Sequence, residues 1–293
     1  MKAAVIIGGG PAGCQCALWL CMLGYEATII EKSDRLGGLQ CNSPYVNDWL
    51  VGTVNLRGQD IANNIQKQIE KMNIPVLYNS IINSIKKNST GFEINTGNEI
   101  IATHNLVIAT GVRPRDGSFE STSAVIVGPG KEIYNEQFTN RRVAILGGGD
   151  SAAENYSFIR EKNPKLCHVY ARTVKARQNL WGKIDSSDIF LGEYKADQKS
   201  MSIIHDDKMY IYDIFTVLYG WEANIPNSLL SLKNQLLNEQ GFIAIDESRR
   251  TRISNIFAAG EVTHFLHPCV ATAMADGVIV AKSIQFQFEN IIA

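Results

Sequence analysis

The sequence lacks a long apolar run and has no excess of charge of either sign. No stretch approaches the roughly 18 apolar residues that a membrane span needs. The 28 basic and 29 acidic residues give a formal net charge of −1, so composition offers no broad basic surface for nucleic acid or for an anionic membrane. The first apolar run is also too short for a signal peptide. We therefore expect a cytoplasmic protein without nucleic-acid or membrane partners.

Cysteine pairs of the C-x-x-C type are also absent. The six cysteines are Cys14, Cys16, Cys21, Cys41, Cys167 and Cys269. Structural disulfides are rare in a reducing compartment. The first three cysteines fall on one expected helix, where we expect them to pack as small apolar side chains. His264 and His267 have no further ligand nearby, so no metal site is expected.

What the sequence does contain is a glycine-rich loop near its start. An apolar strand at 3–7 runs into Gly8, Gly10 and Gly13 in the pattern G-x-G-x-x-G, and a helix follows. A second apolar strand then ends at Glu31, 23 residues after Gly8. The glycines permit a tight turn and close approach of a pyrophosphate to the helix N-terminus, and the acid can accept both ribose hydroxyls. This order predicts a dinucleotide-binding unit.

Three further segments identify the dinucleotide by resemblance. Residues 31–38 follow the pattern E-x-x-x-x-L-G-G, and residues 107–111 read V-I-A-T-G. Residues 255–262 read N-I-F-A-A-G-E-V. Together these segments resemble the FAD motifs of the two-dinucleotide flavoprotein disulfide reductases, although that family usually has Asp where this chain has Glu261. The resemblance implies bound FAD.

A second glycine loop repeats the first pattern. An apolar strand at 142–146 enters G-G-G-D-S-A, which is similar to the NADPH loop of the low-molecular-weight thioredoxin reductases. Where an NAD site has an acid, this chain has Ala171 and Arg172. NADPH-specific members carry two arginines and a further Arg there; Arg172 matches one of them, and Arg177 is about one residue out of register. This pattern favours NADP(H) over NAD(H), and the alternative is a solvated basic loop that binds no nucleotide.

The resemblance fails at the redox disulfide. In thioredoxin reductases the C-x-x-C pair would fall near residues 130–133, but no cysteine lies between Cys41 and Cys167. Dithiol exchange is therefore not expected in its usual place. Cys41 and Cys269 are weak catalytic candidates, because each follows a segment that resembles a flavin-binding motif. Small residues at 271–281 predict a helix against the first glycine loop, and by resemblance the amides at 269–271 would face the flavin.

The expected fold is α/β, with two three-layer Rossmann-like domains. An FAD domain of residues 1–115 and 221–293 would be interrupted by an NADP(H)-type domain of residues 116–220. The inserted domain looks shortened, because only about 40 residues separate Tyr170 from the next expected strand at 209–218. Hinges are expected at 111–115 and 220–223, and turn signals at 88–99 suggest a β-meander.

The leading hypothesis is an FAD-dependent NAD(P)H oxidoreductase that reduces a ferredoxin-like, flavodoxin-like or quinone-like acceptor directly. The alternatives are thiol, disulfide or peroxide chemistry at Cys41 or Cys269, and a non-catalytic flavin or nucleotide sensor. A homodimer is implied by the resemblance alone. The resemblance assigns to FAD the residues Gly8, Gly10, Pro11, Ala12, Gly13, Glu31, Lys32, Gly38, Leu39, Gln40, Ala109, Thr110, Gly111, Gly260, Glu261, Cys269, Val270 and Ala271. It assigns to the second nucleotide Gly147, Gly149, Asp150, Ser151, Ala152 and Arg172.

Overall fold

The computed structural model describes residues 2–263 and 268–289. The chain divides into two compact units. The first contains residues 1–112 and 222–293, and the second contains residues 113–221. Each unit contains a parallel or largely parallel sheet packed against helices, so the expected α/β fold with two Rossmann-like domains is confirmed. No helix in the described residues is long and apolar enough to cross a membrane.

The first unit contains a seven-stranded sheet. Its parallel part consists of β3 (Val76–Leu77), β2 (Ala27–Ile30), β1 (Lys2–Ile7), β6 (Ile100–Ile108) and β17 (Ile256–Ala258). Two antiparallel strands, β5 (Phe92–Asn95) and β4 (Ser84–Lys87), extend the sheet beyond β6 and form the expected meander.

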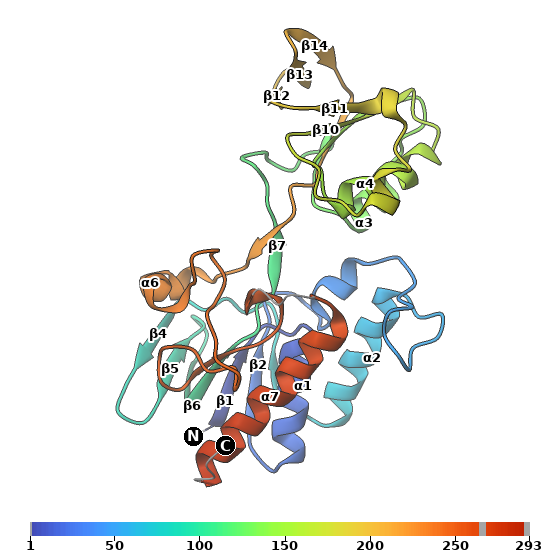
Figure 1. Ribbon diagram of the computed structural model, residues 1–293. Helices are drawn as coiled ribbons and strands as arrows, with labels where there is room; N and C mark the ends of the chain where they lie inside the picture. The colour runs from blue at the N-terminus through green and yellow to red at the C-terminus, as the bar shows by residue number, and fades with distance from the viewer. Residues whose placement is uncertain (1, 264–267, 290–293) are drawn as a thin grey trace. The chain divides into compact units, whose positions relative to one another are not determined.

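Both faces of this sheet are covered because successive side chains of a strand point to opposite sides. On one face, which α1 (Pro11–Met22), α2 (Gly58–Lys71) and α7 (Val270–Glu289) cover in Figure 1, Ala4 and Ile6 belong to the core cluster with residues of these helices. On the other face, Val5 and Ile7 pack toward Leu229 and Leu236 of η3 (Asn227–Leu232) and α6 (Lys233–Leu236). Strands β1 and β6 are therefore packed between two core clusters, one on each face of the sheet.

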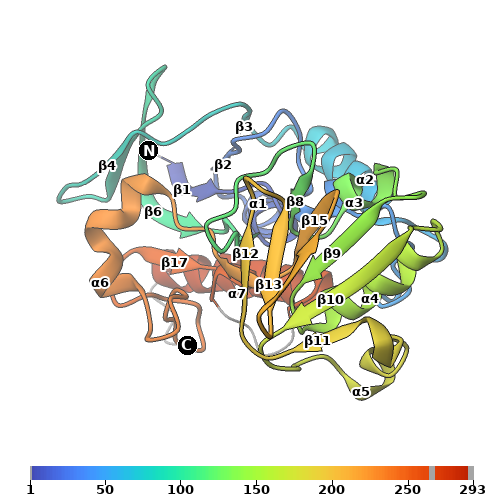
Figure 2. The same cartoon turned by 90° about the horizontal axis from the view of Figure 1, so that it is seen from above.

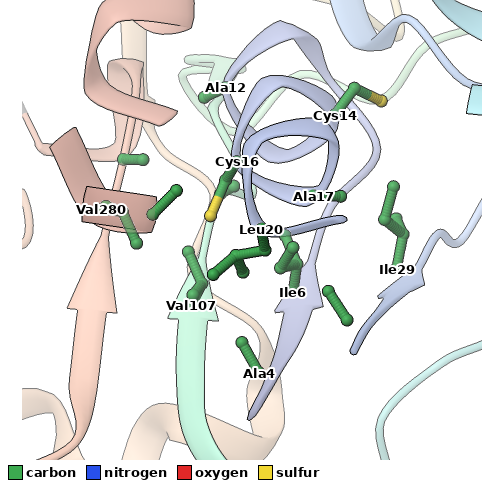
Figure 3. Packing of buried hydrophobic residues seen from close by; sticks show 14 of the residues in the cluster. Ala4, Ile6, Ala12, Cys14, Cys16, Ala17, Leu20, Ile29, Val107 and Val280 are labelled. Atoms are coloured by element: carbon green, nitrogen blue, oxygen red, sulfur yellow. The ribbon is translucent and has the colours of Figure 1, made fainter. Parts of the chain in front are cut away.

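The cysteines of α1 are part of this core. Cys16 lies on the side of α1 that faces Val280 of α7, while Cys14 lies on the opposite side of the helix (Figure 3). Both side chains are buried and Cys21 is partly buried, which confirms the expected packing role. Burial raises the pKa of both the Cys14 and the Cys16 thiols, so neither is available as a thiolate.

The second unit contains a five-stranded parallel sheet. The strands lie in the order β11 (Ile189–Leu191), β10 (Leu166–Ala171), β9 (Arg142–Leu146), β15 (Ile214–Val217) and β8 (Val125–Val127), which Figure 2 shows from above. The short helices α3 (Lys131–Asn135) and α5 (Gln178–Trp181) join α4 (Asp150–Arg160) on one face. A three-stranded antiparallel sheet of β12 (Tyr194–Asp197), β13 (Ser202–His205) and β14 (Lys208–Ile211) packs on the other face.

The prediction of a single strand at 209–218 was wrong. Residues Lys208–Ile211 pair with β13, whereas Ile214–Val217 pair with β9, so the segment belongs to two sheets. The chain changes direction between them, where Tyr212 N donates to Met201 O at 2.9 Å. There Asp213 also accepts Arg142 N at 2.8 Å and the Arg142 guanidinium at 2.7 Å. An apolar run alone does not reveal this polar anchor.

Two short paired strands carry the chain between the units. They are β7 (Val112–Pro114) and β16 (Trp221–Ala223), and they fall on the segments expected as hinges. Asn224 secures the return to the first unit, because its N donates to Gly111 O at 3.0 Å and its Nδ2 to Thr110 O at 3.2 Å. The remaining short turns are η1 (Gly38–Asn42), η2 (Ser186–Asp188) and η4 (Glu261–Thr263).

Candidate cofactor-binding sites

The first glycine loop joins β1 to α1 at the carboxyl edge of the sheet. Gly8 has a φ of +106°, and a Cβ there would lie 2.4 Å from Ala109 O, so only glycine fits the turn. Helix α1 begins at Pro11 and has neither a side-chain cap nor an acidic residue in its first turn. Its first amides and partial positive charge are therefore available to an anion such as a pyrophosphate.

Glu31 is buried at the end of β2 beside this loop. One oxygen, Oε2, accepts Gly9 N at 2.7 Å, and the other, Oε1, accepts Ser33 N at 2.8 Å. Each oxygen still has accepting capacity, so the carboxylate is held in place and can accept the two hydroxyls of a ribose. The sequence identified the acid but not the two amides that orient it.

The double glycine after β2 lies directly against the first loop. Gly37 N donates to Gly9 O at 2.8 Å, and a Cβ on Gly38 would come within 3.0 Å of Gly10 Cα. Two backbone segments without side chains thus lie side by side, which leaves room for a flat ligand to approach the main chain. Lys32, Gly38 and Leu39 are exposed around this point, and Gln40 is partly buried.

Two polar groups lie near the same edge, and one of them has no partner among the described residues. The Oγ1 atom of Thr110, which follows β6 in the segment 109–111, is buried and makes no hydrogen bond there. Glu261 follows Gly260 after β17, and burial raises the pKa of its carboxyl group. Buried polar atoms are normally paired, so the Thr110 hydroxyl indicates a polar ligand at this edge, where the partly buried Glu261 carboxyl group is a second polar group. The two glycine segments, the fixed carboxylate of Glu31 and the polar groups of Thr110 and Glu261 together fit FAD.

A buried ion pair that the sequence analysis missed holds the segment at Gly260. Asp276 of α7 accepts Arg249 Nε at 2.7 Å through Oδ1 and Gly260 N at 2.9 Å through Oδ2. The side chains of Asp276 and Arg249 are 1% and 14% exposed. The available signal was an acid among the small residues of the C-terminal helix, where a buried charge requires a partner.

The N-terminus of α7 carries Cys269, which is exposed, beside buried Val270 and exposed Ala271. Partial burial by itself would raise the pKa of this thiol, but hydrogen bonds with Thr272 and the Ala271 amide outweigh it and lower the pKa. His264 and His267 lie outside the described residues. Within residues 2–263 and 268–289, no cluster of His, Cys, Asp and Glu is suited to a metal ion.

The second glycine loop follows the geometry of the first. Gly8 N donates to Ile30 O at 2.9 Å, and Gly147 N donates to Tyr170 O at 2.9 Å. The residue after each acceptor is therefore equivalent, and Ala171 stands where the first unit has Glu31. Without a carboxylate there, a negatively charged 2′-phosphate would meet no repulsion from this position. Arg172, the next residue, is exposed and makes no ion pair within the described part of the chain.

The other predicted members of this loop lie together at the start of α4. Gly149 precedes the helix, Asp150 is its first residue, Ser151 is partly buried and Ala152 is fully buried. Arg177, the arginine out of register, is bonded to Asp150 at 2.7 Å. It is therefore engaged by a carboxylate, unlike Arg172. The second loop thus also fits a nucleotide, and Arg172 offers it a guanidinium that has no ion pair within residues 2–263 and 268–289.

The other thiols are poorly placed for chemistry. Cys41 in η1 is half-buried, and its Sγ donates to Leu36 O at 3.1 Å. Burial raises the pKa of Cys41, and the nearby Arg35 offsets this only in part. Cys167 is buried in the core of the second unit, where burial raises the pKa of its thiol.

Comparisons with known proteins agree with this geometry. The model of the family described as pyridine nucleotide-disulphide oxidoreductase matches residues 2–178. Ferredoxin–NADP reductase 2 of Bacillus velezensis is 28% identical over 282 residues, covering 88% of this chain and 83% of that protein. Thioredoxin reductase of Borreliella burgdorferi is 24% identical over 301 residues, covering 97% and 91%.

Among solved structures, the thioredoxin reductase of Lactococcus lactis in its FR conformation superposes with a TM-score of 0.82 at 21% identity. The superposition covers 99% of this chain and 100% of that one, so the fold is shared along the whole length. The family model covers more than half of the 293 residues. The chain therefore belongs to the pyridine nucleotide-disulphide oxidoreductase family and is an FAD-dependent oxidoreductase of thioredoxin reductase-like fold.

Proposed function

We propose that this protein takes electrons from NADPH through FAD and delivers them directly to a one-electron carrier protein of the ferredoxin type. The relative from Bacillus velezensis carries the name ferredoxin–NADP reductase, which supports this class of acceptor. The redox chemistry would be supplied by FAD, which can accept a hydride and release its electrons to a separate acceptor. The chain's residues bind and orient the two dinucleotides.

In the first unit, the amides at the start of α1 would bind the pyrophosphate of FAD. Glu31, fixed by two backbone amides, would accept the adenosine ribose hydroxyls. Thr110 and Glu261 would hydrogen-bond the middle of the cofactor, because the Thr110 Oγ1 atom is buried without a partner in the described residues and Glu261 is a partly buried carboxyl group at the same edge. In the second unit, the helix α4 would bind the pyrophosphate of NADPH and Arg172 its 2′-phosphate.

One observation carries the proposal of direct transfer. Cys167 is the only cysteine in the sequence of the second unit, residues 113–221. It is 0% exposed, and burial raises the pKa of its thiol. A dithiol relay needs two thiols that can reach each other and an acceptor. The nucleotide unit has one cysteine, which supports electron transfer without a cysteine pair in this unit.

Anaerobic stopped-flow mixing of the holoenzyme with NADPH, and separately with NADH, tests the proposal. Flavin absorbance at about 450 nm is expected to fall rapidly with NADPH and more slowly with NADH, and to recover when oxidised ferredoxin is added. The double variant Cys41→Ser/Cys269→Ser is the matched control and should keep both phases. If neither nucleotide reduces the flavin, the proposed function is wrong.

Thiol chemistry at Cys269 is the second candidate. Its thiol is exposed at the N-terminus of α7, and hydrogen bonds lower its pKa despite partial burial, as a nucleophilic cysteine requires. If this candidate holds, Cys269→Ser abolishes reduction of a low-molecular-weight disulfide such as oxidised glutathione, while Cys41→Ser leaves it intact. Direct transfer instead predicts that neither substitution changes the turnover with ferredoxin.

A further inference from the structure

The N-termini of the two nucleotide-binding helices differ in charge. Helix α1 has no acidic residue in its first turn, whereas α4 has Asp150 as its first residue. Both helices directly follow a glycine loop that would bind a pyrophosphate. A carboxylate at that position in α4 would repel the incoming phosphates unless its charge were neutralised. The second unit therefore requires a positive charge beside Asp150, which the first unit does not need.

Arg177 supplies a neutralising charge. Its N donates to Asp150 Oδ1 at 2.7 Å and its Nε donates to Asp150 Oδ2 at 2.7 Å, so both carboxylate oxygens are engaged. Its Nη2 lies 3.5 Å from Glu154 Oε1 on the next turn of α4. Burial, and then the neighbouring Asp150 carboxylate, raise the pKa of Glu154. The cluster thus places one guanidinium between two carboxylates.

The loop that presents Arg177 is folded onto the glycine loop. Lys175 N and Ala176 N donate to Gly148 O at 2.7 and 2.9 Å. The Arg177 and Asp150 side chains are 55% and 40% exposed, and an ion pair at that exposure adds little to folding stability. The position of this ion pair beside the N-terminus of α4 points instead to a role in nucleotide binding.

Resting on the proposed function, we infer that Arg177 is a counter-charge for Asp150 that permits pyrophosphate binding, and that it is not a ligand of the 2′-phosphate. Discrimination between NADP(H) and NAD(H) is then left to Arg172, whose guanidinium has no ion pair in the described residues. The two arginines have separable effects. Arg172 affects only nucleotides that carry the 2′-phosphate, whereas Arg177 affects both nucleotides through their common pyrophosphate.

A charge-restoring double variant tests this inference. NADP⁺ and NAD⁺ are titrated into the FAD-loaded full-length protein by isothermal titration calorimetry. Arg177→Gln is expected to lower the affinity for both nucleotides by the same factor, about tenfold for an exposed charge of this kind. Asp150→Asn in that background returns the cluster to its wild-type net charge and keeps an oxygen for the backbone N of residue 177. It should restore both affinities to within about twofold.

Two further variants complete the comparison. Arg172→Gln should weaken NADP⁺ alone. Lys165→Gln removes the same charge from an exposed residue at the opposite end of β10 and should change neither affinity. Loss of NADP⁺ affinity alone in Arg177→Gln, or no rescue by Asp150→Asn, would overturn the inference while leaving the proposed function intact. Failure of the wild type to bind either nucleotide would overturn both.

Discussion

The buried pair of Arg249 and Asp276 offers the sharpest test of how the FAD unit is held together. Asp276→Ala removes the 2.7 Å bond to Arg249 and the 2.9 Å bond to Gly260 N in one step. Breaking a buried ion pair from one side costs about 3–5 kcal/mol, because a charge is left in the core without its partner. Arg249 keeps its bond to Glu247 O at 3.1 Å, so the lower part of that range is expected.

Conservative and double variants separate charge from packing. Asp276→Asn keeps one accepting oxygen and nearly the same volume, so we expect a loss of about 1.5–3 kcal/mol, comparable to one net hydrogen bond to a charged group. The double variant Arg249→Ala/Asp276→Ala should lose less stability than the sum of the two single variants, because each single variant leaves one charge uncompensated and the double variant leaves none. The matched control is Asp213→Asn, whose ion pair with Arg142 is 26% and 35% exposed, with an expected loss under about 1 kcal/mol.

The assay is urea denaturation at a fixed excess of FAD. Release of flavin fluorescence reports the first unit, and far-UV circular dichroism reports the whole chain. Because Asp276 also orients Gly260 beside Glu261, flavin release should move to lower urea in Asp276→Ala, with a smaller change in Asp213→Asn. Equal midpoints in wild type and Asp276→Ala, or full additivity in the double variant, would refute the assignment of this pair as a charge-coupled support of the site.

Two further predictions concern single carboxylates. In Glu31→Gln the new NH₂ group must face Gly9 N or Ser33 N, and both of these are donors. The resulting loss of about 1–3 kcal/mol should lower the affinity for FAD about ten- to a hundredfold in a fluorescence titration. An unchanged affinity would contradict the role of Glu31. Hydrogen bonding to Arg142 lowers the pKa of Asp213 to about 2, so its stabilisation is complete above the unfolded pKa of about 4 and is lost as pH falls toward 2. The difference in thermal midpoint between wild type and Asp213→Asn should therefore shrink across that acid range, and a constant difference would count against the ion pair.

Local patterns were sufficient to predict the parts of the fold that depend on one strand, one loop and one helix in succession. The order of strand, glycines, helix and acid around Gly8 and Glu31 demands one geometry, because the tight turn and the close approach to Ala109 exclude any side chain at Gly8. The second loop at Gly147 followed for the same reason. The α/β class was confirmed on this basis.

Features that depend on contacts between distant segments were not predicted. The expected strand at 209–218 was wrong because the bend at Tyr212 and Asp213 is held by Arg142 and Met201, which no local pattern around the bend reveals. The partnership of Arg249 with Asp276 spans 27 residues and appears in the sequence only as two charges among many. Spacing along the chain predicted where a loop lies, but not which carboxylate it would bind.

The two glycine loops show how one backbone geometry can accept different charge arrangements. In the first unit a fixed carboxylate, Glu31, stands beside an uncharged helix start. In the second unit the strand end carries Ala171 and the carboxylate stands instead at the helix start, as Asp150. Arg177 forms an ion pair with this carboxylate. Such an exchange keeps an acid near each loop but frees the strand end for a phosphate. If the charge of Arg177 had no role in nucleotide binding, the double variant at Arg177 and Asp150 would have the same nucleotide affinity as the variant at Arg177 alone. The calorimetric comparison distinguishes these two outcomes directly.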